Sequence, residues 1–318
     1  MINFAPHFAH GANEQDMTKL QNTLKKDYTF AGKGLHCGKN VSMTLKPAPV
    51  DTGILFVRTD IGPEAKVAAL AENVSSTARS TTISCGEASV GTIEHLLSAL
   101  TGLGVDNCIV EIDNQEVPIL DGSAKPYVDA IAGDGLEEQD APRRYVTLPH
   151  AVEFKNEETG AYLRLEPAEE ADYHLTIDFN SKILGVQNAD WSPEKTDYAS
   201  QISPCRTFCF FHEIEYLLTN NLIKGGDVDN ALVIVEYPIS VEQIKCVCQH
   251  LGKPEMKVTN GYLNESLKFE NECARHKMLD LIGDLRLTGG FLKAKVTAYK
   301  SGHTINTKTA KLVREMVK

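Results

Sequence analysis

The apolar pattern of the chain runs twice through a similar order of strands and helices, and this order constrains the fold more than any other feature. In the first run, the spacing of apolar residues predicts strands at 41–46, 54–57, 81–84 and 107–112 and helices at 89–103 and 126–132. In the second run, it predicts strands at 152–154, 162–165, 174–178, 231–235 and 291–299 and helices at 211–220, 271–287 and 304–316. A polar, acidic stretch over 133–144 lies between the runs and is typical of a linker.

This order predicts an α+β fold with two similar domains, each a β-sheet with helices. The length of 318 residues fits two domains of ordinary size. We expect an N-terminal extension over 1–16, a first domain over 17–143 and a second over 144–318. Within the first domain, Gly102 and Gly104 are expected to end the helix over 89–103.

Composition excludes several classes of protein. The net charge of −11 argues against nucleic-acid binding, which normally needs a basic face. No stretch reaches the ~20 apolar residues that span a bilayer, and the N-terminus lacks the basic start and apolar run of a signal peptide, so we expect a cytoplasmic protein. The eight cysteines are scattered without a CxxC pair, which favours reduced thiols over a cysteine-ligated zinc site.

The helix expected over 271–287 carries polar residues at helical spacing. His276 and Asp280 are four residues apart, so both side chains leave the helix from one face, and Asp284 lies one turn further along that face. A neutral imidazole and a carboxylate on one face suit a divalent metal such as zinc. An ordinary solvated face with ion pairs gives the same spacing, so the pattern by itself leaves both interpretations open.

A second group of candidates lies on the helix expected over 89–103. Glu94 and His95 are adjacent, so their side chains diverge by about 100° and one could bind a metal while the other works beside it. A surface Glu–His pair is the ordinary alternative. Together, His95, His276 and Asp280 would form a three-ligand zinc site with an open position for water, between the two halves.

Three further places carry chemical groups. His303 follows the last expected strand and could act as a general acid, with Asp284 accepting its other ring proton. Lys277 could stabilise a charged substrate. In the segment 205–210, Thr207 offers a hydroxyl. Taken singly, each residue also has an ordinary interpretation: a solvent-exposed loop for His303, a surface lysine for Lys277 and a strand end for Thr207.

Nine short segments form a combined pattern, and they are Gly32–Gly38, Lys46–Pro49, Thr92–Leu97, Val105–Asn107, Pro118–Ser123, Cys205–Phe210, Gly225–Ala231, Ala274–Leu285 and Ser301–His303. With these segments in this order over about residues 18–315, the chain resembles the UDP-3-O-acyl-N-acetylglucosamine deacetylase family. The resemblance implies two α+β domains with the helices sandwiched between two sheets and a metal site at the domain interface.

The resemblance also implies a role for each matched residue. The metal ligands are expected to be His95, His276 and Asp280. The general base is expected to be Glu94 and the general acid His303, with Asp284 holding the acid imidazole and Thr207 stabilising the oxyanion. The residues expected near the substrate are Lys277 and Phe208 at the sugar nucleotide, Phe210, Ile214, Ile223 and Gly226 along the acyl-chain passage, and His36 near the metal.

The implied activity is zinc-dependent removal of the N-acetyl group from UDP-3-O-(3-hydroxyacyl)-N-acetylglucosamine in lipid A biosynthesis. A His₂Asp set can also take Fe(II). The implied partner is the UDP-linked acylated glucosamine. We further expect transient contact with the inner-membrane surface, where an amphipathic substrate can be met, and no obligate protein partner.

Two departures from the common family pattern stand out. The chain is about two dozen residues longer between Ile234 and Leu267, which predicts an added helix and loop and resembles a subgroup sometimes fused to a 3-hydroxyacyl carrier-protein dehydratase. The other is the N-terminal extension, which has no functional interpretation. A metal amidase acting on a different N-acyl sugar, and a non-catalytic sugar-nucleotide binding module on the same fold, stay open as alternatives.

Overall fold

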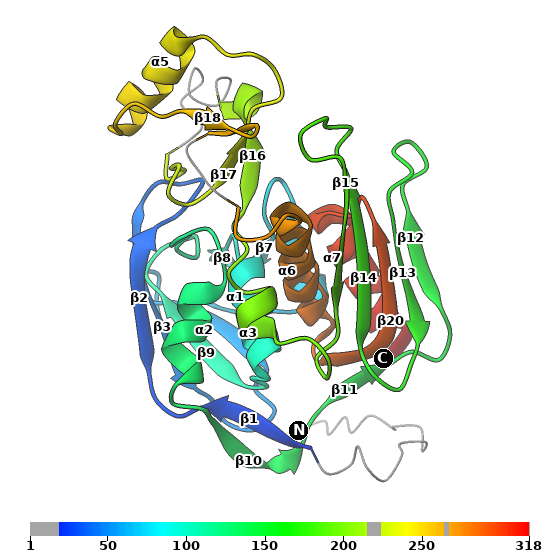
Figure 1. Cartoon of the computed structure of the whole chain (residues 1–318). Coiled ribbons are helices and arrows are strands. Elements are labelled where there is room, and N and C mark those ends of the chain that lie inside the picture. Colours follow the sequence, from blue (N-terminus) through cyan, green and yellow to red (C-terminus); the bar gives the residue numbers. More distant parts are fainter. Residues whose placement is uncertain (1–18, 215–223, 264–266, 318) are drawn as a thin grey trace.

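A layer of helices lies between two β-sheets, as the family resemblance implies (Figure 1). The structure is a computed structural model that describes residues 19–214, 224–263 and 267–317. One sheet comes from the first half of the chain and the other from the second half. The N-terminal extension over 1–16 and the expected passage residue Ile223 lie outside the described residues. The fold class is the expected α+β arrangement.

The first half builds a five-stranded sheet in the order β2-β3-β9-β4-β5, in which only β4 and β9 run parallel. A three-stranded sheet, β6-β7-β8, and the pair β1-β10 complete this half. Its elements are β1 Leu20–Leu24, β2 Tyr28–Lys33, β3 Asn40–Pro47, β4 Ile54–Arg58, β5 Lys66–Ala68, η1 Ala71–Asn73, β6 Val74–Ser76, β7 Thr82–Cys85, β8 Ala88–Val90, α1 Glu94–Leu103, β9 Cys108–Ile112, α2 Lys125–Ala132 and β10 Leu136–Pro142.

The second half builds the sheet β12-β13-β20-β14-β15, and β11 adds to it by pairing with β20. Strand β20 runs parallel to both β11 and β14. The elements of this sheet and of the helices beside it are β11 Tyr145–Thr147, β12 Val152–Lys155, β13 Tyr162–Pro167, β14 Asp172–Asp178, β15 Val186–Trp191, α3 Tyr198–Gln201, α6 Glu272–Leu285, η2 Arg286–Thr288, β20 Phe291–Tyr299 and α7 His303–Val317.

A small lobe between α3 and α6 contains the added segment (Figure 1). Its elements are β16 Phe208–Phe210, β17 Leu232–Ile234, α5 Val241–Leu251, β18 Val258–Thr259 and β19 Tyr262–Leu263. The expected extra helix is α5, and Ser240 begins it with a capping box in which the side chains of Ser240 and Gln243 bond each other's backbone N–H groups. The lobe packs its own apolar cluster around Val233 and Val247.

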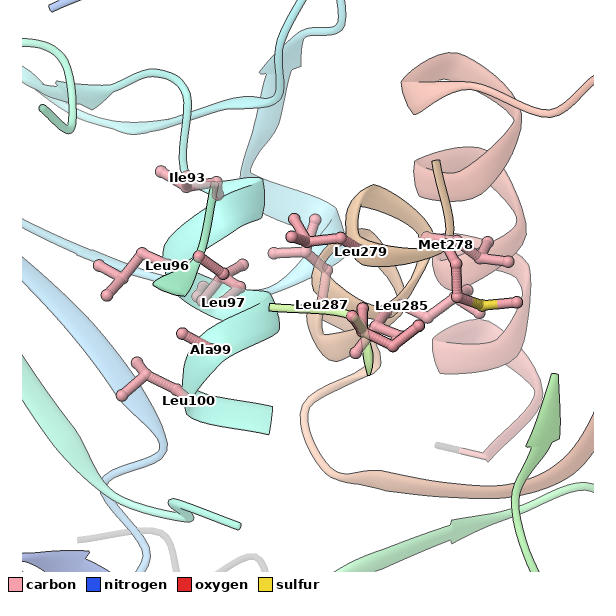
Figure 2. Close-up of a cluster of buried hydrophobic side chains, with 14 of the residues drawn as sticks. Ile93, Leu96, Leu97, Ala99, Leu100, Met278, Leu279, Leu285 and Leu287 are labelled. Carbon is pink, nitrogen blue, oxygen red and sulfur yellow. The ribbon is translucent and has the colours of Figure 1, made fainter. Parts of the chain in front are cut away.

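The centre of the molecule is the contact between α1 and α6. Figure 2 shows Leu96, Leu97 and Leu100 of α1 and Leu279 of α6 among the buried side chains of this layer, and burying each leucine contributes roughly 1.5–3 kcal/mol. The backbones meet at Gly283, where a Cβ atom would lie 2.0 Å from the carbonyl oxygen of Glu94. Only glycine permits this approach, which brings the polar residues of the two helices together.

Several expected boundaries were wrong for identifiable reasons. The helix expected over 89–103 begins at Glu94, because 88–90 pair with β7 and Thr92 takes a left-handed backbone (φ 56°). Gly102 lies inside that helix, and only Gly104 ends it, with φ 82°. The stretch 133–144 is more than a linker, since β10 pairs there with β1. His303 begins α7 instead of lying in a turn before it.

The helix expected over 211–220 is helical at 211–214, and its remainder lies outside the described residues. Among the described helices, none combines the length and apolar character needed to cross a membrane. The boundary at 143/144 between the two domains stays a prediction.

We predict that Gly283→Ala destabilises the protein by at least about 1–3 kcal/mol, because the added methyl must push α6 away from the backbone of α1. Chemical denaturation measures this as a lower unfolding midpoint. Gly133→Ala is the matched control, since Gly133 has φ −64° and an added Cβ meets nothing within 4 Å. Equal stability of the two variants would contradict the proposed importance of the α1–α6 approach.

Candidate metal centre

Three potential ligands from the two halves meet at the α1–α6 contact. His95 lies in the first turn of α1, and His276 and Asp280 lie one turn apart on α6; each can place one ligand atom within 4.8 Å of the others. The Nε2 atoms of His95 and His276 lie 3.5 and 3.4 Å from Asp280 Oδ1. All three residues are buried. The structure therefore brings together the three residues that helical spacing and resemblance pointed to.

The chemistry of these groups fits a divalent cation. Asp280 Oδ1 is buried and has no hydrogen-bond partner among the described residues, while Oδ2 accepts a bond of 2.8 Å from Lys277. His276 places Nδ1 3.1 Å from the carbonyl oxygen of Cys205, which leaves Nε2 for a metal. A buried carboxylate oxygen without a partner is costly unless a cation completes it.

The protonation states support the same conclusion. Burial lowers the pKa of His276 to about 3, so its imidazole is neutral and able to ligate. Burial opposes ionisation of Asp280, but the ammonium of Lys277 and the neighbouring histidines together outweigh it and hold the pKa of that carboxyl well below its usual range. A neutral imidazole and an ionised carboxylate are the forms that bind zinc.

Glu94, Asp284 and His303 form a second cluster of titratable side chains beside these ligands. Glu94 is buried at the start of α1, and burial raises the pKa of its carboxyl. His303 Nε2 lies 4.0 Å from Glu94 Oε1, and Nδ1 lies 2.9 Å from Asp284 Oδ2. Burial opposes the charged form of His303, but the carboxylates of Asp284 and Glu94 outweigh it and raise the pKa of His303 to about 9. The imidazole is therefore protonated near pH 7.

Comparison with known proteins decides the family. The profile described as UDP-3-O-acyl N-acetylglycosamine deacetylase matches residues 21–246 and 256–316. The chain belongs to this family.

Curated relatives fall into two kinds. "Bifunctional enzyme LpxC/FabZ" of Porphyromonas gingivalis is 43% identical over 300 residues, which cover 94% of this chain and 65% of the relative. "UDP-3-O-acyl-N-acetylglucosamine deacetylase" of Pseudomonas entomophila is 41% identical over 300 residues, which cover 93% of this chain and 90% of the relative. The protein of the same name from Teredinibacter turnerae is 40% identical over 300 residues, which cover 94% of this chain and 90% of the relative. The chain thus spans 65% of the length of the bifunctional relative and 90% of the others.

The family profile leaves out residues 247–255, which lie in the second part of α5 and the loop that follows. This gap falls inside the added segment expected between Ile234 and Leu267. The family match therefore includes both helices of the candidate metal centre, and its internal gap lies in the lobe.

Three of the residues expected at the substrate or the oxyanion, Lys277, Phe208 and Thr207, lie on α6 and at the start of the small lobe. Lys277 Nζ lies 5.6 Å from the ring centre of Phe208, and that ring lies 6.3 Å from the ring of His276. Thr207 directly precedes β16, where its N–H donates to the carbonyl of Gly122. The structure thus places Phe208 and Lys277 beside the candidate centre.

The described residues expected along the acyl-chain passage lie in the small lobe that begins with β16. Phe210 contacts Phe179 with ring centres 5.9 Å apart, and Ile214 is buried in the cluster of the small lobe. Gly226 lines a cavity of about 500 Å³ whose walls include Ile119 and Leu120 but none of the three candidate ligands. A passage formed by these positions stays a prediction.

His36 depends on a residue that the sequence patterns missed. The Glu116 carboxylate is buried and accepts bonds from the N–H groups of His36 (2.9 Å) and Cys37 (2.8 Å) and from the Thr92 hydroxyl (2.9 Å). It thereby ties the loop of His36 to the left-handed residue that precedes α1. Burial lowers the pKa of His36. Only its place two residues before the matched segment at Pro118 could have drawn attention to Glu116.

Two other missed residues hold Asp284. Its Oδ1 accepts a bond of 2.6 Å from the Thr81 hydroxyl, and its Oδ2 accepts a bond of 2.9 Å from the side-chain amide of Asn306. Sequence patterns place Thr81 at a strand and Asn306 in a helix, and give neither a role. Hydrogen bonds between distant elements leave no periodic signal in a sequence.

We predict that His276→Ala abolishes stable zinc binding, because it removes one of three protein ligands. Zinc per chain after dialysis, and competition with a chromophoric chelator, should show a loss of zinc affinity. The loss should exceed the ~10–100-fold that is typical when a residue that only hydrogen-bonds a metal ligand is changed. His174→Ala is the matched control, since His174 pairs with Asp172 and Asp190 on an exposed strand face. Full zinc occupancy in His276→Ala would rule out this ligand set.

Proposed function

We propose that this protein removes the N-acetyl group of UDP-3-O-(3-hydroxyacyl)-N-acetylglucosamine by zinc-dependent hydrolysis, in lipid A biosynthesis. The observation that carries the proposal is the buried His₂Asp set together with Glu94, which is next to His95 on α1 and lies 4.0 Å from His303 Nε2. Family membership and the names of the deacetylase relatives support the substrate.

The metal ligands would be His95, His276 and Asp280. A zinc ion held by them would supply Lewis-acid activation of water and of the amide carbonyl. Lys277 would help to hold Asp280 in its ionised form through their hydrogen bond of 2.8 Å. Iron(II) is an alternative metal for the same ligands.

Glu94 would act as the general base. Burial raises the pKa of its carboxyl, which strengthens it as a proton acceptor. The carboxylate takes a proton from the attacking water, whose oxygen forms the new bond to the acetamide carbon. Thr207 would donate a hydrogen bond to the oxyanion that develops on the carbonyl oxygen.

His303 would act as the general acid. The protonated imidazole, held at Nδ1 by Asp284, delivers the proton of Nε2 to the amide nitrogen as the carbon–nitrogen bond breaks. The products are acetate and the free amino sugar. The pKa of His303, about 9, keeps its imidazole charged at neutral pH.

Substrate contacts follow from the surrounding residues. We propose that Lys277 and Phe208 contact the sugar nucleotide, that Phe210, Ile214, Ile223 and Gly226 line the acyl-chain passage, and that His36 lies near the reacting group. The proximity of a cation and an aromatic ring to the candidate centre supports the first of these. A cytoplasmic location and transient contact with the inner-membrane surface belong to the same proposal, and fractionation and co-sedimentation with anionic vesicles test them.

We predict that the protein releases acetate from UDP-3-O-(3-hydroxyacyl)-N-acetylglucosamine, that a chelator stops the release and that zinc restores it. The compound without the acyl chain should react much more slowly. No release from folded, zinc-loaded protein would refute the proposed substrate, and equal rates on both compounds would favour a broader amidase. Release that a chelator does not affect would refute the metal dependence.

We predict that Glu94→Ala retains zinc but lowers kcat by about 10²–10⁴-fold, the usual contribution of a general base. Glu87→Ala, at an exposed residue of the turn before β8, is the control. Acetate release and metal content are measured on the same samples. Near-normal turnover of Glu94→Ala would remove this residue from the mechanism.

The pKa of His303 gives a prediction for pH dependence. A general acid must be protonated, so kcat/KM should fall as the pH rises through the pKa of His303. The midpoint should be no higher than about 9, since a bound zinc cation nearby would favour the neutral imidazole. His303→Gln should lack this alkaline limb. A limb of the same midpoint in His303→Gln would assign it to another group.

A further inference from the structure

Thr81 makes hydrogen bonds to the carboxylates of both Glu94 and Asp284. It lies immediately before β7 and is fully buried. Its backbone N–H donates to Glu94 Oε2 at 3.0 Å, and its hydroxyl donates to Asp284 Oδ1 at 2.6 Å. One residue of the first half thus contacts the proposed base and the carboxylate that holds the proposed acid.

The backbone of Thr81 is fixed to α1 on both sides. Its N–H bonds the Glu94 side chain, and its carbonyl oxygen accepts a bond of 3.4 Å from the N–H of Ile93. The hydroxyl is therefore the one polar group of Thr81 that reaches α6. Removing the hydroxyl breaks the hydrogen bond of Thr81 to Asp284 and leaves its two backbone bonds at the start of α1 in place.

The hydroxyl also decides how Asp284 can turn. Oδ2 of Asp284 accepts bonds from His303 Nδ1 and from the Asn306 amide, both at 2.9 Å, and Oδ1 accepts the bond from Thr81. With donors on both oxygens, the carboxylate cannot rotate without breaking one of them. A carboxylate held only at Oδ2 could rotate and swing the imidazole of His303 with it.

We propose that Thr81 is a positioning residue for the hydrolysis, which fixes the Asp284–His303 pair relative to Glu94 through its hydroxyl. The inference rests on the proposed function, because it assigns Thr81 a part in the proton transfers of that reaction. Thr81 acts through Asp284 and His303 and touches neither water nor substrate in this role. Small displacements of such groups cost large factors in rate.

The test uses the full-length, zinc-loaded protein with Thr81→Val, which keeps the branched shape and removes the donor, and Thr81→Ser, which keeps the hydroxyl. Thr81→Val should lower kcat by about 10–100-fold, the usual cost of losing a supporting hydrogen bond, with KM within about twofold and zinc content unchanged. Thr81→Ser should restore most of kcat. Thr29→Val is the matched control, at a threonine pair on the exposed face of β2.

Action through Asp284 gives a second requirement. In an Asp284→Ala background the hydroxyl has lost its acceptor, so adding Thr81→Val should change kcat by less than about twofold. A full additional loss in that background, a normal kcat for Thr81→Val, or failure of Thr81→Ser to rescue would each overturn the proposal. A raised KM with unchanged kcat would also overturn it, since it would indicate a role in ground-state binding.

A spectroscopic readout separates this inference from the proposed reaction. The ring nitrogen and proton resonances of His303, assigned by comparison with His303→Gln, should shift in Thr81→Val and return toward wild type in Thr81→Ser. If the wild-type protein releases no acetate but these shifts occur, the proposed function fails and the positioning of His303 by Thr81 stands. If the wild type is active and the resonances do not move, the positioning role is wrong.

Discussion

The contact between α1 and α6 is the constraint on which the rest of the structure depends. It exists because Gly283 lets the backbones meet where any side chain would collide with the carbonyl oxygen of Glu94. The apolar faces of both helices stabilise the contact, as Leu97 and Leu279 illustrate (Figure 2). The same approach forces His95 and Glu94 of one half against His276 and Asp280 of the other. Polar residues are buried here because the helices that carry them are held by apolar packing.

The electrostatics of this buried cluster favour a bound cation. Three carboxylates, those of Glu94, Asp280 and Asp284, face two cations, Lys277 and the protonated His303, so negative charge is in excess. Buried charge without compensation is costly, and the carboxyl of Glu94 responds with a raised pKa. A divalent ion between the ligands would offset the excess and make the ionised form of Glu94 easier to reach. Metal binding and the proton-accepting state of Glu94 would thus be coupled.

Sequence patterns predict the parts of this arrangement that are periodic. Helical spacing is enough to place His276 and Asp280 on one face, and alternation gives β20 its bounds of 291–299. The pairing of His95 with that face is a hypothesis from the three ligands that a catalytic zinc needs, and the resemblance implies it too, since no local rule brings two distant helices together. Neither periodic spacing nor the resemblance points to Thr81 or Glu116, because both act through hydrogen bonds to residues distant in the sequence. The strand β10 is missed because its exposed, polar residues carry no apolar alternation.

The added segment and the candidate metal centre can coexist because α6 is anchored before it reaches the potential ligands. Glu272 in the first turn of α6 accepts bonds from the Arg206 side chain at 2.9 and 3.2 Å, and it is fully buried. Arg206 lies just before β16, so the bond joins the chain before the lobe directly to the chain after it. Arg206 then fixes the start of α6. The added residues around α5 pack within the lobe, in its own apolar cluster. An insertion between β17 and α6 therefore leaves His276 and Asp280 in register with His95.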